Sequence, residues 1–196
     1  MKVLVVYCHP SKTSFTHKVK EEFVKGLQYA NHEYDISDLY EMSFNEVLSE
    51  EEYLREAYYK SEIPVAEDVL IEQKKVQEAD AIAFIYPVFW TEAPAKLVGW
   101  FDRVWTCGFA YNPEPQMKIL KKAIFIAIAG KTLQTLEETG EKEAMETVML
   151  GDRVRHRAKE KKMVILDEMT HWNEEAYRNS KINQHLQDVY ELGRGF

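Results

Sequence analysis

The sequence contains very little cysteine. Cys8 and Cys107 are the only two in 196 residues, and their spacing fits neither a metal-ligand motif nor a disulfide framework. His156, His171 and His185 are also scattered without ligand spacing, so we predict no zinc or iron centre. Two isolated thiols fit a reducing compartment, or a protein indifferent to redox conditions, and we expect a cytoplasmic location.

Long hydrophobic runs are absent too. The apolar run from Val3 to Tyr7 is far shorter than the hydrophobic region of a signal peptide, and His9 and Pro10 end it. No other stretch approaches the roughly 20 apolar residues that a bilayer-spanning helix needs. We therefore expect a soluble protein with no signal peptide and no transmembrane segment.

Positive charge is scarce as well. Lysine and arginine number 25 against 33 aspartates and glutamates, which gives a formal net charge of -8. A surface that binds nucleic acid needs clustered basic side chains, so this balance argues against a nucleic-acid partner. The remaining composition, 45% apolar and 30% charged, is ordinary for one globular domain spanning residues 1–196.

What the chain does have is a regular alternation of strand and helix patterns. β-branched runs without polar alternation are typical of strands buried on both faces of a parallel sheet. Right-handed crossovers between such strands favour a flavodoxin-like α/β fold, a three-layer sandwich with a five-stranded parallel sheet of order 2-1-3-4-5 and helices on both faces. Strands are predicted at residues 2–7, 33–38, 81–86, 123–129 and 163–167, and helices at about 15–27, 49–60, 64–78, 95–105, 141–161 and 174–192.

One segment interrupts this alternation. Residues 39–63 are rich in glutamate and tyrosine, and Ser49 and Glu52 have the spacing of a capping box at the start of a helix. We interpret the segment as a helical excursion that shapes the rim of a pocket. The strand before it, residues 33–38, is more polar than the first and suits an edge of the sheet.

Three loops are predicted to meet at one edge of the sheet, because the carboxyl ends of parallel strands lie together there. They span residues 9–16, 87–94 and 130–136 and follow the first, third and fourth strands. None contains GxGxxG or GxxxxGK[ST], so neither a Rossmann dinucleotide nor a nucleoside triphosphate is expected.

The first loop precedes a helix and carries many hydroxyls. Ser11, Thr13, Ser14 and Thr16 lie where backbone amides and the helix dipole favour an anion. These hydroxyls either bind a phosphate group or only cap the helix, and the loop alone does not decide between the two.

The second loop lies in an aromatic region. Pro87 and Pro94 restrict its backbone, while Phe89 and Trp90 supply planar faces. Aromatic residues at this edge favour a flat, conjugated ligand such as a flavin. The alternative is that Phe89 and Trp90 are ordinary core or dimer-interface residues.

The third loop and the segment after the last strand give weaker signals. In Ala129, Gly130 and Lys131 the glycine permits close approach of a ligand to the backbone. His171 and Trp172 either approach the pocket or belong to the capped start of the last helix.

These motifs together resemble a known family. HPSKTSF, YPVFWTEAPAKLVGWFDRV and CGFAY are similar to the NAD(P)H quinone dehydrogenases of the DT-diaphorase type, together with their bacterial modulator-of-drug-activity and potassium-efflux ancillary relatives. The similarity covers the first two thirds of the chain, including DLY at residues 38–40 and EQKKVQEAD at residues 72–80. Beyond Gly130 only the strand and helix pattern is shared.

The resemblance implies a flavin-binding domain. A flavin ring would lie across the second and third loops with its phosphate at the first. FAD is the expected cofactor, and FMN is the alternative. The resemblance and the hydroxyls of the first loop together give the expected cofactor-binding residues. They are His9, Ser11, Thr13, Ser14, Phe15, Thr16, Pro87, Val88, Phe89, Trp90, Thr91, Ala129, Gly130 and Lys131.

The activity implied by the resemblance is that of an NAD(P)H oxidoreductase. Hydride would pass from the co-substrate NAD(P)H through the flavin to a quinone or similar small acceptor by a ping-pong mechanism. Trp90 and Lys131 are the candidate catalytic residues; Lys131 is either a positive charge near the reduced ring or a solvated loop lysine. A flavodoxin-like electron carrier, or a redox-sensing regulatory subunit of a transporter, is the alternative function.

The sequence also departs from this family. Mammalian-type enzymes carry a tyrosine and a histidine after the third flavin loop, where an approximate alignment finds Leu136 and Lys142. Thr91 replaces an aromatic residue that usually lies near the substrate. The family's proton relay therefore does not transfer to this chain.

An excess of aromatic residues bears on assembly. Trp100, Phe101, Trp105, Phe109 and Tyr111 supply more apolar surface than one helix and its loop are expected to hide against a single sheet. We predict a homodimer that buries this surface, which the resemblance also implies.

Overall fold

The structure is a computed structural model that describes residues 1–112 and 114–196. Its strands are β1 (Lys2–Tyr7), β2 (Glu33–Asp38), β3 (Ala81–Pro87), β4 (Leu120–Ile128) and β5 (Ala158–Leu166). They form one parallel sheet in the order β2-β1-β3-β4-β5. This confirms the predicted fold class and strand order, with the polar strand β2 at one edge.

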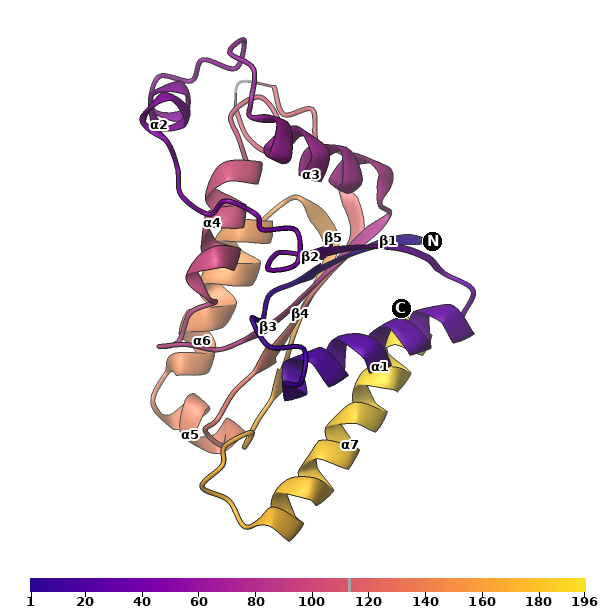
Figure 1. Ribbon diagram of the computed structural model, residues 1–196. Helices are drawn as coiled ribbons and strands as arrows, with labels where there is room; N and C mark the ends of the chain where they lie inside the picture. Colours follow the sequence, from indigo (N-terminus) through magenta and orange to yellow (C-terminus); the bar gives the residue numbers. More distant parts are fainter. Residues whose placement is uncertain (113) are drawn as a thin grey trace.

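Helical segments cover both faces of the sheet. They are α1 (Phe15–Tyr29), α2 (Glu50–Ala57), α3 (Glu67–Glu78), α4 (Ala95–Val104), α5 (Leu133–Glu138), α6 (Glu141–Glu146), the π-helical η1 (Thr147–Val154) and α7 (Glu175–Arg194). Figure 1 shows α1 and α7 on one side of the sheet and α3, α4 and α6 on the other. In the described residues, none of the helices has both the length and the apolar character needed to cross a bilayer.

The apolar residues of the central strands divide between the two faces. Val3 and Val5 of β1 face the core under α1 and α7, while Leu4 and Val6 face the core under α3 and α4. Because successive strand residues point to opposite faces, a strand covered on both sides must be apolar throughout. The unbroken apolar runs in the sequence have this origin.

Two helix starts follow directly from local sequence. Ser14 Oγ accepts a hydrogen bond from the His17 amide at 3.1 Å and begins α1. Ser49 and Glu52 make both hydrogen bonds of the predicted capping box at α2. Because a cap of this kind stabilises a helix by about 1 kcal/mol, these signals are strong enough to place both starts.

The carboxyl-terminal third differs from the prediction. The helix predicted over residues 141–161 is wrong beyond Val154, where η1 ends; Arg155 then takes a φ of 43° and β5 begins at Ala158. The charged segment at 159–162 has good helix-forming residues. It lies instead on an edge strand, where charged side chains face solvent and discourage pairing with another sheet.

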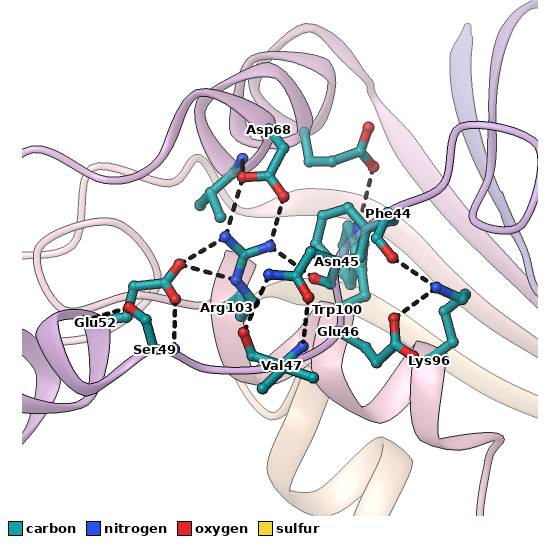
Figure 2. Close-up of polar contacts among 12 residues, drawn as sticks. Phe44, Asn45, Glu46, Val47, Ser49, Glu52, Asp68, Lys96, Trp100 and Arg103 are labelled. Atoms are coloured by element: carbon teal, nitrogen blue, oxygen red, sulfur yellow. Dashed lines mark hydrogen bonds and ion pairs between the residues drawn. The ribbon is translucent and has the colours of Figure 1, made fainter.

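The excursion is fixed to α4 by polar contacts. The Arg103 side chain is only 3% exposed and donates hydrogen bonds to the carboxylates of Glu52 and Asp68 and to the Asn45 carbonyl oxygen (Figure 2). Burial alone would lower the pKa of Arg103, but the two carboxylates outweigh it and raise the pKa. A permanently charged guanidinium therefore joins the starts of α2 and α3 to α4.

A close backbone approach strengthens the same contact. A Cβ on Gly99 would lie 2.2 Å from the Glu46 carbonyl oxygen, so only glycine fits at this position of α4. Next to it, Lys96 Nζ donates to the Phe44 carbonyl oxygen at 2.6 Å and to the Glu46 carboxylate at 2.5 Å (Figure 2). Residues 44–46 are therefore held against α4 by packing as well as by charge.

Candidate functional site

The first, second and third loops lie at one edge of the sheet. They follow β1, β3 and β4, which are adjacent strands. Backbone hydrogen bonds continue past the strand ends: the Cys8 amide donates to the Ile85 carbonyl at 3.0 Å, and the Val88 amide to the Ile128 carbonyl at 2.8 Å. The third loop is shorter than predicted because α5 already begins at Leu133.

A cavity of about 610 Å³ opens between the second and third loops. Six of its lining residues come from those loops, and the others come from the helices after β4 and from the segment after β5. None comes from residues 39–63, which line two other cavities instead. The lining residues are Val88, Trp90, Thr91, Ala129, Gly130, Lys131, Leu136, Glu141, Thr170 and Trp172.

The sequence signals missed part of this lining. Glu141 and Thr170 carry no recognisable motif, because the elements that bear them follow the last loop of the resemblance. Trp172 lines the cavity, and α7 begins later, with Glu174 at its cap position. Between the two alternatives left open for Trp172, the structure favours the pocket.

The second loop is a tight turn under strain. Phe89 and Glu92 exchange backbone hydrogen bonds of 2.8 and 2.9 Å, and the two residues between them, Trp90 and Thr91, have φ values of 52° and 64°. Two consecutive left-handed residues define a type I′ geometry, which favours asparagine and glycine. The turn holds the Trp90 side chain 99% exposed at the cavity. Strain of this kind is typical of sites where backbone position serves a ligand.

Replacing Thr91 by glycine should therefore stabilise the fold. Glycine takes a positive φ without steric cost, so we expect a gain of about 1 kcal/mol in the free energy of unfolding. For a chain of this size that is a rise of roughly 2–4 °C in melting temperature. The measurement is thermal unfolding by circular dichroism, with Thr91→Ala as the control that should not gain. An unchanged melting temperature for Thr91→Gly would contradict a strained turn.

The cavity offers backbone donors and an open floor. In residues 1–112 and 114–196, no hydrogen-bond acceptor lies within reach of the amides of Trp90, Thr91, Gly130 and Lys131. A Cβ on Gly130 would meet only Thr170 Cβ, at 3.8 Å. The site therefore fits a flat ligand with polar edges that lies close to the backbone.

The first loop is ordered by its own hydrogen bonds. His9 Nδ1 accepts from the Ser11 amide at 2.9 Å, and the hydroxyls of Ser11 and Thr13 are 3.0 Å apart. The Ser14 hydroxyl caps α1, and Thr16 is buried. Among the four hydroxyl residues of this loop, only Ser11 and Thr13 are therefore neither buried nor engaged in capping the helix. These residues, with Phe15, lie beside the second loop in the sheet order, but none of them lines the 610 Å³ cavity.

Three charged or reactive groups near the loops have environments that limit their chemistry. Burial lowers the pKa of His9, so the imidazole is neutral at pH 7 and can act as a hydrogen-bond donor but not as a cation. Burial raises the pKa of the Cys8 thiol to about 12, which leaves it protonated and unreactive. Lys131 Nζ lies 2.5 Å from a carboxylate oxygen of Glu141, another cavity residue.

The aromatic residues after the second loop do not form an exposed patch. Trp100, Phe101, Trp105 and Phe109 are all buried within one chain, packed on Phe84 and Phe125 or on one another. The argument that a second subunit is needed to cover them is therefore wrong. The apolar side chains that remain exposed lie elsewhere, among them Tyr53 and Tyr58 on the excursion, Trp90 at the turn and Trp172 after β5.

A family model described as having a flavodoxin-like fold matches residues 1–154. The chain belongs to this flavodoxin-like family. Its fold and the position of its cavity, outside the carboxyl ends of adjacent parallel strands, agree with that assignment.

Three relatives show over how much of its length this flavodoxin-like protein is similar to known proteins. One solved structure is the NAD(P)H:quinone oxidoreductase from Methanothermobacter marburgensis, which is 43% identical in sequence and has a TM-score of 0.92. The match covers 99% of this chain and 96% of the Methanothermobacter chain. NAD(P)H dehydrogenase (quinone) 1 from Cavia porcellus is 37% identical over an alignment of 124 residues that covers 57% of this chain and 45% of the relative. Ribosyldihydronicotinamide dehydrogenase (quinone) from Rattus norvegicus is 40% identical over an alignment of 126 residues that covers 57% of this chain and 54% of the relative.

The matched regions span about half the length of the two mammalian relatives. The archaeal structure, in contrast, is matched over nearly its whole length, including the segment after β5 that forms part of the cavity. This flavodoxin-like chain is therefore close in length to the Methanothermobacter marburgensis protein and matches only about half of each mammalian relative.

Proposed function

We propose that the protein is a flavin-dependent NAD(P)H oxidoreductase that reduces a quinone or similar small acceptor by a ping-pong mechanism. The observation that carries the proposal is the 610 Å³ cavity, which has free amides on two loops, an open floor at Gly130 and the exposed indole of Trp90 beside it. A flat ring with polar edges matches this combination. The names of the relatives support the same activity.

The residues that would hold the flavin fall into two groups. The ring group lines or adjoins the cavity, and the phosphate group lies at the start of α1, where the amides of Phe15 and Thr16 have no acceptor in the described chain. The ring group is Pro87, Val88, Phe89, Trp90, Thr91, Ala129, Gly130 and Lys131. The phosphate group is His9, Ser11, Thr13, Ser14, Phe15 and Thr16, with Ser14 and Thr16 contributing through backbone position because Ser14 caps the helix and Thr16 is buried.

The chain supplies placement and electrostatics rather than a nucleophile. A bound flavin supplies the capacity to take up and release a hydride, so that both substrates can use one open face in turn. The free amides of the second and third loops would hold and orient the ring, and the exposed Trp90 would exclude water beside it. Overall, a hydride from NAD(P)H and one proton from solvent convert the quinone to the hydroquinone and leave NAD(P)⁺.

The decisive experiment is a steady-state assay of the purified protein. We expect a yellow preparation, or one that takes up FAD or FMN, that oxidises NADH or NADPH continuously when 1,4-naphthoquinone is supplied. Titration with each flavin separately would decide between FAD, which we favour, and FMN. A flavin-loaded protein that cycles only with a protein reductase would be an electron carrier instead, and a protein that binds neither flavin would refute the proposal.

Lys131 is proposed to stabilise negative charge on the reduced ring. Its ammonium group is half exposed and paired with Glu141, so its influence is reduced by solvent and by the carboxylate. Lys131→Gln should lower the midpoint potential of the bound flavin by roughly 15–30 mV, measured by dye-coupled redox titration. Lys142→Gln is the matched control, because Lys142 pairs with Glu137 and does not line the cavity. Equal shifts in the two variants would remove this role from Lys131.

The protein is proposed to act as a homodimer in the cytoplasm. Support for the dimer comes from the exposed apolar side chains of the excursion, Val47, Tyr53, Leu54, Tyr58 and Tyr59. Both cysteines are free, which suits a reducing compartment. Sedimentation velocity of the purified protein would test the dimer, and a monomer at micromolar concentration would exclude it.

A further inference from the structure

The segment after β5, residues 167–173, is built against the third loop. The Met169 amide donates to the Ala129 carbonyl at 2.9 Å, and the Glu168 amide donates to the Lys131 carbonyl at 3.1 Å. In the other direction, the Leu133 amide donates to a carboxylate oxygen of Asp167 at 2.8 Å. This β5–α7 segment and the third loop therefore form one unit at the cavity.

The segment is also fixed from the side of α7. Glu168 has a φ of 61°, and its carboxylate accepts a hydrogen bond from Tyr177 at 2.7 Å and pairs with Lys181. Asn173 Nδ2 donates to the Glu168 carbonyl oxygen at 3.1 Å. A segment anchored on both sides holds its side chains in defined positions, which a binding site requires.

This fixed segment presents a second exposed tryptophan to the cavity. Trp172 is 95% exposed, and Trp90 on the opposite loop is 99% exposed. Across residues 1–112 and 114–196, these are the two most exposed large apolar side chains, and both line the same cavity. Exposed indoles that converge on one cavity indicate a planar partner, because a stacked ring buries their surface.

We propose that Trp172 is a specificity-determining residue that stacks on fused-ring aromatic electron acceptors and favours them over acceptors without an aromatic plane. The inference rests on the proposed oxidoreductase function and names the acceptor class for that site. Trp90 comes from the second loop, which is proposed to hold the flavin, whereas Trp172 comes from the segment after β5, which lines the same cavity together with Gly130. Trp172 is therefore placed to contact the second substrate.

The test measures binding and turnover separately. The first measurement is the dissociation constant of 1,4-naphthoquinone for the oxidised, flavin-loaded protein without NAD(P)H, by titration calorimetry, repeated on protein without flavin. The second is kcat/KM with 1,4-naphthoquinone and with ferricyanide, which has no ring to stack. The variants are Trp172→Ala and Trp172→Phe. Tyr29→Ala is the matched control, because Tyr29 is an exposed aromatic at the end of α1 that does not line the cavity.

We expect Trp172→Ala to raise the dissociation constant of naphthoquinone and to lower its kcat/KM by about tenfold, without change in the ferricyanide rate or the flavin content. Trp172→Phe should recover most of the loss, and Tyr29→Ala should resemble the wild type. Unchanged naphthoquinone binding, an equal loss for both acceptors, loss of flavin, or a change in oligomeric state on sedimentation would each overturn the inference. Failure of the wild-type protein to take up flavin would instead refute the proposed function. The naphthoquinone titration on protein without flavin measures the effect of Trp172 separately, so failure of the proposed function and failure of this inference can be told apart.

Discussion

Replacing Arg103 by alanine is expected to lower the free energy of unfolding by about 3 kcal/mol. All of the hydrogen bonds of Arg103 lead into the excursion or the start of α3, and its side chain is nearly fully buried (Figure 2). Its removal leaves the carboxylates of Glu52 and Asp68 close together without a counter-charge. Because both carboxylates keep some contact with solvent, we place the loss at the lower end of the range for buried pairs.

The measurement is urea unfolding followed by circular dichroism, and melting temperature should fall by roughly 6–12 °C. Arg103→Lys keeps the charge but not the planar fork, so it should recover only part of the loss. Lys25→Ala is the control, because Lys25 belongs to an exposed pair with Glu22 on α1 and its loss should leave the stability nearly unchanged. Equal losses for Arg103→Ala and Lys25→Ala would show that the excursion is not held by this contact.

Replacing Gly130 by valine should affect binding rather than stability, in contrast to Arg103→Ala. We expect a large loss of flavin affinity with little loss of stability. A Cβ at Gly130 has free space on the protein side, meeting only Thr170 Cβ at 3.8 Å, so the fold without ligand should tolerate it within about 0.5 kcal/mol. The same atoms would occupy the cavity floor on which the ring is proposed to lie. We expect the flavin dissociation constant to rise at least about 100-fold, equivalent to about 2.7 kcal/mol.

This prediction is checked by titrating the flavin-free protein with FAD and FMN and following the quenching of flavin fluorescence. Gly151→Val is the matched control, because a Cβ on Gly151 meets no atom within 4 Å and the residue lies in η1, away from the cavity lining. Tight flavin binding by Gly130→Val would place the ring somewhere else. A strongly destabilised Gly130→Val protein would show that the glycine serves the fold.

The sequence predicted the first half of the fold well because its signals there are local. The cap at Ser14, the capping box at Ser49 and Glu52, and the unbroken apolar runs of β1 and β3 each depend on neighbouring residues. The second loop was identified because its prolines and aromatics are close in sequence. These features need no knowledge of long-range contacts.

The parts that could not be predicted depend on tertiary contacts. The first half of β5 has charged residues with helix-forming propensity, and only its pairing with β4 makes it a strand. The aromatic residues around Trp100 looked too numerous for one chain, but Phe84 packs edge-to-face against Trp100 and stacks on Phe125 in a single core. The contribution of Trp172 to the cavity arises from hydrogen bonds between distant loops, which no local pattern records.

The central claim is that the turns after β3 and β4, together with the start of α1, hold a flavin. A crystal structure of the protein grown with saturating FAD or FMN tests this most directly. The account predicts electron density for the ring against Gly130 and the Trp90–Thr91 turn, with the phosphate beside residues 9–16. Density for the ring at any other cavity, or clear density for side chains filling this one, would contradict it.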